Sequence, residues 1–432
     1  MPVASLLHSL LVFFCPKSFT LGESILITSI ASFSFTDLSF HLLSHFAPSI
    51  IPPAFQSILL THRRTPVGAM QTILIWGMLL IGLVNWISGT SPKLLGVKTS
   101  SHSTSQSTRE KHQRLSMIFH GTSILLIVLV LAPLTTALMN GEDPFSFTLF
   151  YVLRNPTRVT LCIGWLSVLS SIWVFRHWLQ GVSSRANDSS PAAVATPQVE
   201  DDDDTATARK ELKKMINIRR KFYHAIVFLI VVPGWFFDIK FLSLALTTLL
   251  SIFLLCEFHR ALGVSPFGLI LDSFMKTFTD EKDASGPLIT GHIYLLCGVA
   301  GGIWLQTCVF LDNQIFSRLS NSVHSHSMVD SPPGIPPLAA LAGAIILGLG
   351  DSIASIIGYS LGDKRHKWPG TSKSLEGTIG FMISVGLGGA ILESVLRPGI
   401  HIKTMIPWFV TSISCGMSPI SAHSCNESNL HA

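Results

Sequence analysis

One acidic residue inside an apolar segment constrains this chain most. Residues 338–361 read LAALAGAIILGLGDSIASIIGYSL, and Asp351 is the only ionisable carboxylate in that run. A carboxylate at membrane depth costs several kcal/mol, so it needs a partner or a function. Residues 362–378 follow directly as GDKRHKWPGTSKSLEGT, in which basic residues alternate with glycine and hydroxyl side chains. A carboxylate beside such a loop is typical of phosphoryl transfer.

The composition predicts an all-α, polytopic transmembrane helix bundle. The chain has 432 residues, is 48% hydrophobic and only 13% charged, and has a mean hydropathy of +0.50. Soluble domains carry about 25% charged residues. Apolar runs near the roughly 20 residues that span a bilayer predict about eight to eleven membrane segments. They fall at 71–87, 117–139, 159–175, 222–237, 241–256, 288–311, 338–361, 378–396 and 405–415, with one or two more within 6–60.

The chain divides into four predicted regions. Residues 1–180 hold N-terminal membrane helices, and residues 181–208 form a disordered linker that ends in an acidic block. Residues 209–415 carry all the polar motifs and form the predicted catalytic membrane domain, while 416–432 are a polar tail. Residues 88–114, rich in Ser, Thr and Lys, are a second predicted linker.

Charge and cysteine usage exclude some classes of function. The net charge of +5 is concentrated in loops, so nucleic-acid binding is not needed to explain it. Basic loops stay cytosolic, which places residues 209–221 and 362–377 on that side of a membrane. The seven cysteines are scattered without a CxxC pair, and this favours core residues over a disulfide or zinc framework.

Helical spacing gathers small and polar residues around Asp351. If the segment is a regular α-helix, one face carries Gly348, Asp351, Ser355, Gly358 and Gly362. Glycines on such a face allow close helix packing. Packing does not explain the carboxylate, so we predict a metal-binding or nucleotide-related role for Asp351.

The loop after this helix has two interpretations. Its basic residues suit either a membrane-topology anchor or a polyphosphate site built from backbone N–H groups, hydroxyls and ammonium groups. It does not match the GxxxxGK[ST] pattern of a Walker A loop. Glu376 is predicted to hold Lys373 or to bind a metal. Alternatively, together with Ser374 and Gly377, it caps the following helix.

Two acidic clusters lie upstream. For Glu257 and Arg260, an ion pair that anchors a helix end is a sufficient explanation. Asp280, Glu281 and Asp283 form either a solvated turn or a second set of oxygen ligands, because Mg²⁺ binds carboxylates together with substrate phosphates.

At these residues the sequence resembles the dolichol kinases, a CTP-dependent polyprenol kinase family. Four blocks carry the resemblance. They are RRKFYHAIVFLIVVPGW (219–235), CEFHRALGVSPFG (256–268), DEKDASGPLITGHIYLLCG (280–298) and GLGDSIASIIGYSLGDKRHKWPGTSKSLEGT (348–378). The last block is shared more loosely with other CTP-using lipid kinases, whereas the third is more specific to dolichol kinases.

The resemblance implies a lipid kinase of the endoplasmic reticulum membrane whose active site faces the cytosol. It would transfer the γ-phosphoryl group of CTP to dolichol or another polyprenol, with a divalent metal, Mg²⁺ being the expected one. The product, dolichyl phosphate, serves protein glycosylation. The alternatives are a related kinase for phytol or diacylglycerol, and a membrane transporter or scaffold.

The resemblance also implies the site residues. The catalytic residues are Asp351, Lys373 and Glu376, and Asp351 is also the expected metal ligand. From their acidic cluster alone, Asp280, Glu281 and Asp283 are further candidate ligands. The predicted nucleotide-binding residues are Gly350, Ser352, Ser355, Gly362, Asp363, Lys364, Arg365, His366, Lys367, Trp368, Pro369, Gly370, Thr371, Ser372, Lys373, Ser374, Leu375, Glu376, Gly377 and Thr378.

Overall fold

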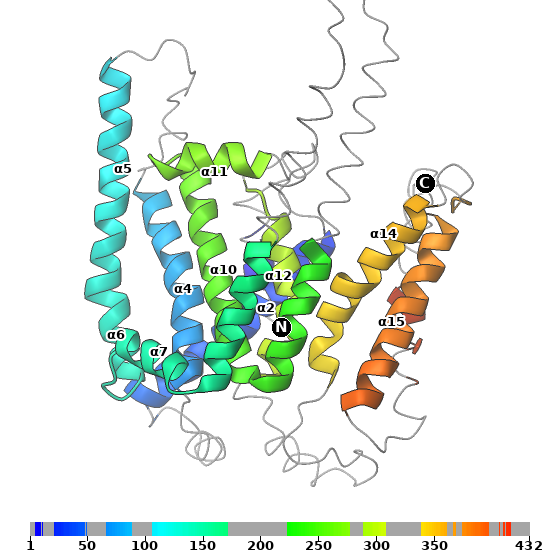
Figure 1. The fold of residues 1–432 in the computed structure, drawn as a ribbon. Helices are drawn as coiled ribbons and strands as arrows, with labels where there is room; N and C mark the ends of the chain where they lie inside the picture. Colours follow the sequence, from blue (N-terminus) through cyan, green and yellow to red (C-terminus); the bar gives the residue numbers. More distant parts are fainter. Residues whose placement is uncertain are drawn as a thin grey trace, which may run out of the picture. The chain divides into compact units, whose positions relative to one another are not determined.

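The fold is a set of apolar helices, seen in a computed structural model (Figure 1). The structure describes residues 5–9, 11, 21–47, 49, 66–88, 106–171, 223–276, 288–307, 338–360, 366–368, 374–396, 406, 409–410 and 412–415. Within these ranges there is no β-strand, and a single antiparallel bridge joins Lys367 to Ser374. The predicted all-α class is confirmed.

Five of the described helices are long and apolar enough to cross a membrane. They are Gly22–Phe46, Pro66–Ile87, Gln113–Leu138, Ile239–Leu262 and Leu375–Val395. Shorter apolar helices cover Pro144–Leu153, Tyr223–Phe237 and Ala344–Gly358. The polytopic membrane bundle is therefore confirmed, whereas the count of about eight to eleven segments stays a prediction.

The labelled elements follow the chain in a simple order. They are α2 (Leu21–Phe46), α4 (Pro66–Ile87), α5 (Gln106–Leu126), η2 (Ile127–Leu131), α6 (Ala132–Leu138), α7 (Pro144–Leu153), α10 (Ile239–Leu262), α11 (Phe267–Lys276), α12 (Gly291–Thr307), η4 (Leu338–Leu341), η5 (Ala344–Gly350), α14 (Asp351–Ser360) and α15 (Leu375–Leu396). A further helix covers residues 156–171. The linker predicted at 88–114 is wrong at its end, because α5 already begins at Gln106.

The chain folds into two compact units, and each unit takes two stretches of sequence. Unit 1 comprises Met1–Arg154 and Asp238–Gly343, and unit 2 comprises Asn155–Phe237 and Ala344–Ala432. The four regions predicted from the sequence are consecutive along the chain and stay a prediction.

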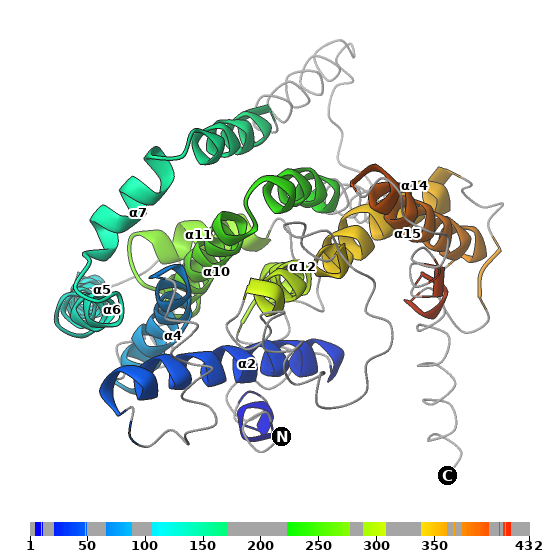
Figure 2. The same cartoon turned by 90° about the horizontal axis from the view of Figure 1, so that it is seen from below.

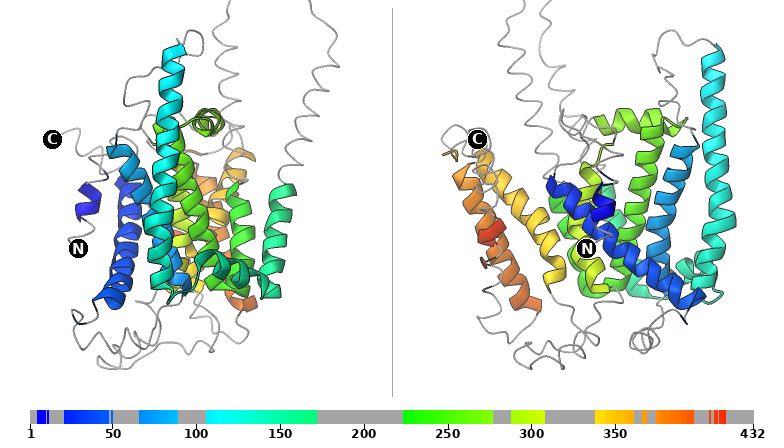
Figure 3. Two further views of the ribbon diagram at one scale, coloured as in Figure 1. Left: turned by 90° about the vertical axis from the view of Figure 1, so that its left-hand side faces the viewer. Right: turned by 180° about the vertical axis from the view of Figure 1, so that it is seen from behind.

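In unit 1, α10 packs along α4 and α12, and α2 packs on α4 and α12 (Figures 2 and 3). Small residues set the spacing of these helices. A Cβ atom at Gly302 would lie 2.7 Å from the carbonyl oxygen of Ala340, and one at Gly343 would overlap that of Gly298. Backbones can approach this closely only where side chains are absent, as is common between membrane helices.

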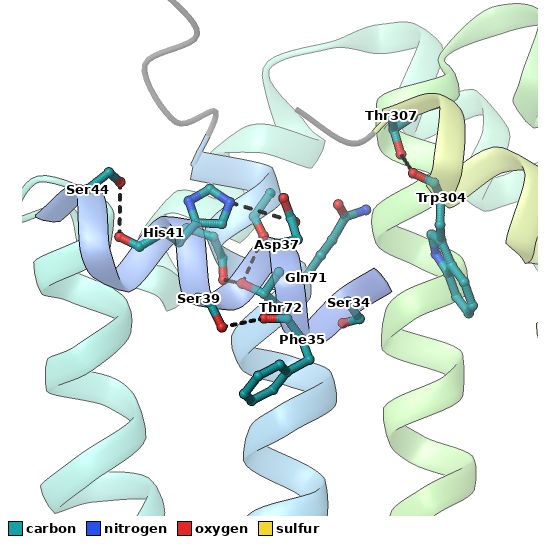
Figure 4. A network of polar contacts seen from close by, with 12 residues as sticks. Ser34, Phe35, Asp37, Ser39, His41, Ser44, Gln71, Thr72, Trp304 and Thr307 are labelled. Carbon is teal, nitrogen blue, oxygen red and sulfur yellow. Dashed lines mark hydrogen bonds and ion pairs between the residues drawn. The ribbon is translucent and has the colours of Figure 1, made fainter. Parts of the chain in front are cut away.

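A polar network links the helices of unit 1 near one end (Figure 4). Gln71 on α4 donates a 2.6 Å hydrogen bond from Nε2 to Ser243 Oγ on α10, which lies 2.8 Å from Thr307 Oγ1 on α12. Trp76 Nε1 donates to Ser34 Oγ on α2 over 3.1 Å. These bonds connect α4, α10, α12 and α2 through polar side chains.

A buried ion pair holds the other end of α10. Arg260 binds both carboxylate oxygens of Glu257, through Nε at 2.9 Å and one terminal nitrogen at 2.5 Å, and the two side chains are only 7% and 3% exposed. Glu257 also accepts a 2.6 Å bond from the backbone N–H of Ile289, and Arg260 reaches Asp272 on α11. The ion pair predicted from the sequence is confirmed, and it ties α10 to α11 and to the start of α12.

In unit 2, α14 and η5 pack lengthwise on α15 (Figures 1 and 3). Glycines again allow the contact: a Cβ at Gly350 would lie 2.6 Å from Val385, and one at Gly380 2.5 Å from Ile357. The helix Tyr223–Phe237 joins this unit, and Trp165 donates a 3.1 Å bond to the carbonyl of Ile230. Unit 2 therefore contains both Asp351 and the end of the predicted phosphate loop.

We predict that Glu257→Ala destabilises unit 1 by about 3–5 kcal/mol, because it leaves a buried guanidinium without its main acceptor. Thermal or denaturant unfolding of the detergent-solubilised protein measures this loss. The double variant Glu257→Ala/Arg260→Ala is the control, and it should lose less than the sum of the two single losses. Additive losses would contradict the pairing.

Candidate active site

Asp351 is held by a histidine that lies 127 residues earlier in the chain. His224 Nδ1 lies 2.9 Å from Asp351 Oδ2. His224 is the second residue of the helix Tyr223–Phe237, and Asp351 is the first residue of α14. The contact therefore joins two stretches of unit 2 that are far apart in the sequence.

The two side chains differ in exposure. His224 is 11% exposed, whereas Asp351 is 33% exposed. An ionised carboxylate only accepts hydrogen bonds, so Nδ1 of His224 is the donor in this pair. His224 consequently lies behind Asp351, and Asp351 is the member of the pair that a substrate can reach.

Irregular helix geometry precedes Asp351. Residues 344–350 are π-helical, and regular α-helix begins at Asp351, whereas the predicted common face assumed an α-helix throughout 348–362. Gly348 lies against Phe228 and the carbonyl of His224, so Gly348 and Asp351 do face the same neighbouring helix. π-Helical turns are uncommon and occur frequently at functional sites.

Glu376 ties the two ends of the basic loop together. Its Oε1 accepts hydrogen bonds from the backbone N–H of His366 at 2.9 Å and from His366 Nδ1 at 2.7 Å, and Oε2 lies 3.2 Å from the same N–H. His366 itself is 84% exposed. The partner of Glu376 that the structure describes is His366, which was not predicted, so Glu376 holds the loop at His366. The predicted roles of holding Lys373 and binding a metal stay predictions.

Further bonds close the base of this loop. Leu375 N–H donates to the carbonyl of His366 over 2.8 Å, and Lys367 pairs with Ser374 in the isolated bridge. Trp368 Nε1 donates to Thr378 Oγ1 over 3.1 Å. These bonds thus hold residues 366–368 against the start of α15.

The predicted cap of α15 is also present. Ser374 Oγ accepts a 3.2 Å hydrogen bond from the N–H of Gly377, and Glu376 lies in the first turn of the helix. A hydroxyl at this position satisfies one of the N–H groups that a helix start leaves without a partner. The carboxylate in the first turn suits the positive end of the helix dipole.

The base of the loop lies close to Asp351 along α14. A Cβ at Gly377 would lie 3.1 Å from the carbonyl oxygen of Ala354, and one at Gly358 would lie 3.0 Å from Ser374 Oγ. Ala354 follows Asp351 by three residues, about one helical turn or roughly 5 Å. Because these two glycines have no side chains, the loop base can lie within about two helical turns of the Asp351 carboxylate.

The other predicted site residues are either buried or half-buried, or they lie outside the described residues. Gly350 and Ser352 are buried and Ser355 is half-buried, so their predicted contact with a nucleotide stays a prediction. The residues outside the described ranges are Gly362, Asp363, Lys364, Arg365, Pro369, Gly370, Thr371, Ser372 and Lys373, together with Asp280, Glu281 and Asp283.

The described residues fit a metal only in part. They contain no group of three or more His, Cys, Asp or Glu side chains placed to hold a metal ion. Mg²⁺ is commonly bound by one or two carboxylates and by the phosphates of its substrate. A partly exposed Asp351 is compatible with that kind of site.

Sequence reasoning missed His224 as a site residue. The block 219–235 contains it, but helical periodicity within one segment cannot identify a partner on another. The available signal was an ionisable residue near the start of an apolar run on the same predicted membrane side as the loop.

The described part of the chain therefore defines a polytopic α-helical membrane protein with a carboxylate–histidine pair beside a basic loop. The chain is similar to the dolichol kinases, and the resemblance is confirmed. It is 26% identical to the dolichol kinase of Homo sapiens over 98% of this chain and 65% of that protein. It is 31% identical to that of Schizosaccharomyces pombe over 63% of this chain and 45% of the relative. It is 28% identical to the dolichol kinase of Saccharomyces cerevisiae over 57% of this chain and 35% of that protein.

The chain spans about two thirds of the length of the human protein that it matches. No family model matches the chain. No solved structure matches it either.

We predict that Glu376→Ala loosens the base of the loop. The N–H of His366 would lose a charge-assisted hydrogen bond, and its hydrogen exchange should accelerate on the order of tenfold. Hydrogen–deuterium exchange with mass spectrometry measures this change. Glu376→Gln keeps a neutral acceptor and serves as the control with a smaller effect. Equal exchange in all three proteins would contradict the loop-holding role.

Proposed function

We propose that this chain is a lipid kinase that transfers the γ-phosphoryl group of CTP to dolichol and forms dolichyl phosphate. The observation that carries the proposal is a partly exposed Asp351, held by His224, within about two helical turns of the loop base. Similarity to dolichol kinases over 98% of the chain supports the choice of lipid and reaction. We place the protein in the endoplasmic reticulum membrane, with this site facing the cytosol.

The reaction needs two substrates from different phases to meet. Dolichol lies in the bilayer with its terminal hydroxyl near the interface, whereas CTP arrives from water. Asp351 belongs to an apolar helix that packs along the membrane-spanning α15, and the loop lies at the end of that helix. A partly exposed carboxylate within an apolar helix and a basic loop at the end of that helix suit this meeting.

The transfer itself asks mainly for positioning and neutralisation of charge. The hydroxyl oxygen of dolichol attacks the γ-phosphorus, the bond from that phosphorus to the bridging oxygen breaks, and CDP leaves while the hydroxyl proton is lost. We assign Asp351 to orienting the hydroxyl or to holding the metal. Lys373, Lys364 and the loop N–H groups neutralise the phosphate oxygens, and Glu376 holds the loop closed at His366.

A divalent metal, Mg²⁺ being the expected one, would be held by Asp351 together with phosphate oxygens of CTP. When bound, it supplies charge neutralisation at the transferred group. Asp280, Glu281 and Asp283 are further candidate ligands from the sequence.

We predict that membranes containing this chain transfer label from γ-labelled CTP to dolichol and that excess unlabelled ATP does not compete. Asp351→Ala should lower the rate on the order of 10²–10³-fold, because it removes one electrostatic contact made in the transition state. Thin-layer separation of the labelled lipid gives the rate, normalised to the amount of protein in the membrane.

The lipid competition separates the alternatives. Transfer to phytol or diacylglycerol in preference to dolichol would identify a related CTP-dependent kinase. If no alcohol accepts phosphate while the protein is present in the membrane, the kinase proposal fails for this chain.

A further inference from the structure

We propose that His224 is a positioning residue for the transfer: it fixes the Asp351 carboxylate through the hydrogen bond from Nδ1 to Oδ2. This inference rests on the proposed function and deepens it. His224 does not itself touch the substrates in this assignment, since it is the more buried member of the pair. Its effect on the reaction passes through Asp351.

The hydrogen bond is short and involves a carboxylate. At 2.9 Å it lies in the range of charge-assisted N–H···O bonds, which are stronger than neutral ones. This bond restricts the side-chain torsions of Asp351, which helps a carboxylate that must face an attacking hydroxyl or a metal to keep its orientation.

His224 is itself held firmly, which a positioning residue requires. Gly348 packs against the helix that carries His224: a Cβ there would lie 2.6 Å from Phe228 Cβ and 3.1 Å from the carbonyl oxygen of His224. Trp165 Nε1 also donates to the carbonyl of Ile230 in the same helix. The helix that carries His224 is therefore held by contacts with two other segments.

A purely structural role makes a different prediction. In that case His224 would only compensate a carboxylate inside an apolar unit, and its loss would lower stability without a specific effect on turnover. Asp351 is 33% exposed, however, so it keeps part of its hydration. A compensating partner is less needed there than beside a fully buried charge.

The test uses the full chain in detergent with dolichol and CTP, and it compares two variants of opposite design. His224→Leu keeps much of the side-chain volume and removes the donor. His224→Asn loses part of the ring and keeps an amide N–H near the position of Nδ1. The matched control is Leu229→Ala, because Leu229 lies on the same helix and is 57% exposed.

We expect His224→Leu to lower kcat by about 10–100-fold, the usual effect of losing a residue that orients a functional ligand. The KM for dolichol and the thermal unfolding midpoint should stay near their wild-type values. His224→Asn should retain most of kcat, and Leu229→Ala should retain all of it.

A double-mutant cycle then tests whether the pair acts as a unit. His224→Leu/Asp351→Asn should be no slower than Asp351→Asn alone, because both variants remove the same oriented carboxylate. Three results would each overturn the positioning role. The first is that the kcat losses of the two single variants multiply in the double variant, and the second is that His224→Leu and His224→Asn lose kcat equally. The third is that a lowered unfolding midpoint accounts for the lost turnover.

The outcomes also separate this inference from the proposed function. An active wild-type chain with an unimpaired His224→Leu variant overturns the inference and leaves the kinase standing. A wild-type chain without transfer to any lipid alcohol overturns both.

Discussion

The need to accommodate a carboxylate within an apolar helix organises unit 2. His224 donates to Asp351 from another helix, and this contact requires the two helices to approach closely. Gly348 allows that approach, since a side chain there would collide with Phe228. This hydrogen bond thus links the position of the carboxylate to the packing of its helix.

A second set of close approaches determines where the basic loop lies. Gly358 and Gly377 allow α15 to begin directly beside α14. Glu376 accepts a hydrogen bond from the backbone N–H of His366 and so holds the loop at that residue. In unit 1, by contrast, the Glu257–Arg260 ion pair and the Gln71–Ser243 bond connect helices.

Much of the candidate site could be predicted from residue type and spacing. Asp351 was found because a lone carboxylate in an apolar run is costly, and Glu257–Arg260 was recognised because opposite charges three residues apart meet on a helix. The partners His224 and His366 were not assigned these roles, because helical spacing relates residues of one segment. The π-helical turn before Asp351 was also missed, since a glycine-rich apolar run fits an α-helix equally well.

The sequence by itself determined that this is an all-α membrane protein with a carboxylate beside a basic loop, because hydrophobic run length and charge placement are read directly from residue types. Only the tertiary structure decided which groups act together. The two stretches of unit 2 are separated by 106 residues of unit 1, Asp238–Gly343, so their contact follows from packing rather than from proximity in the chain. Glycine contacts that bring backbones together made the pairing of His224 with Asp351 possible.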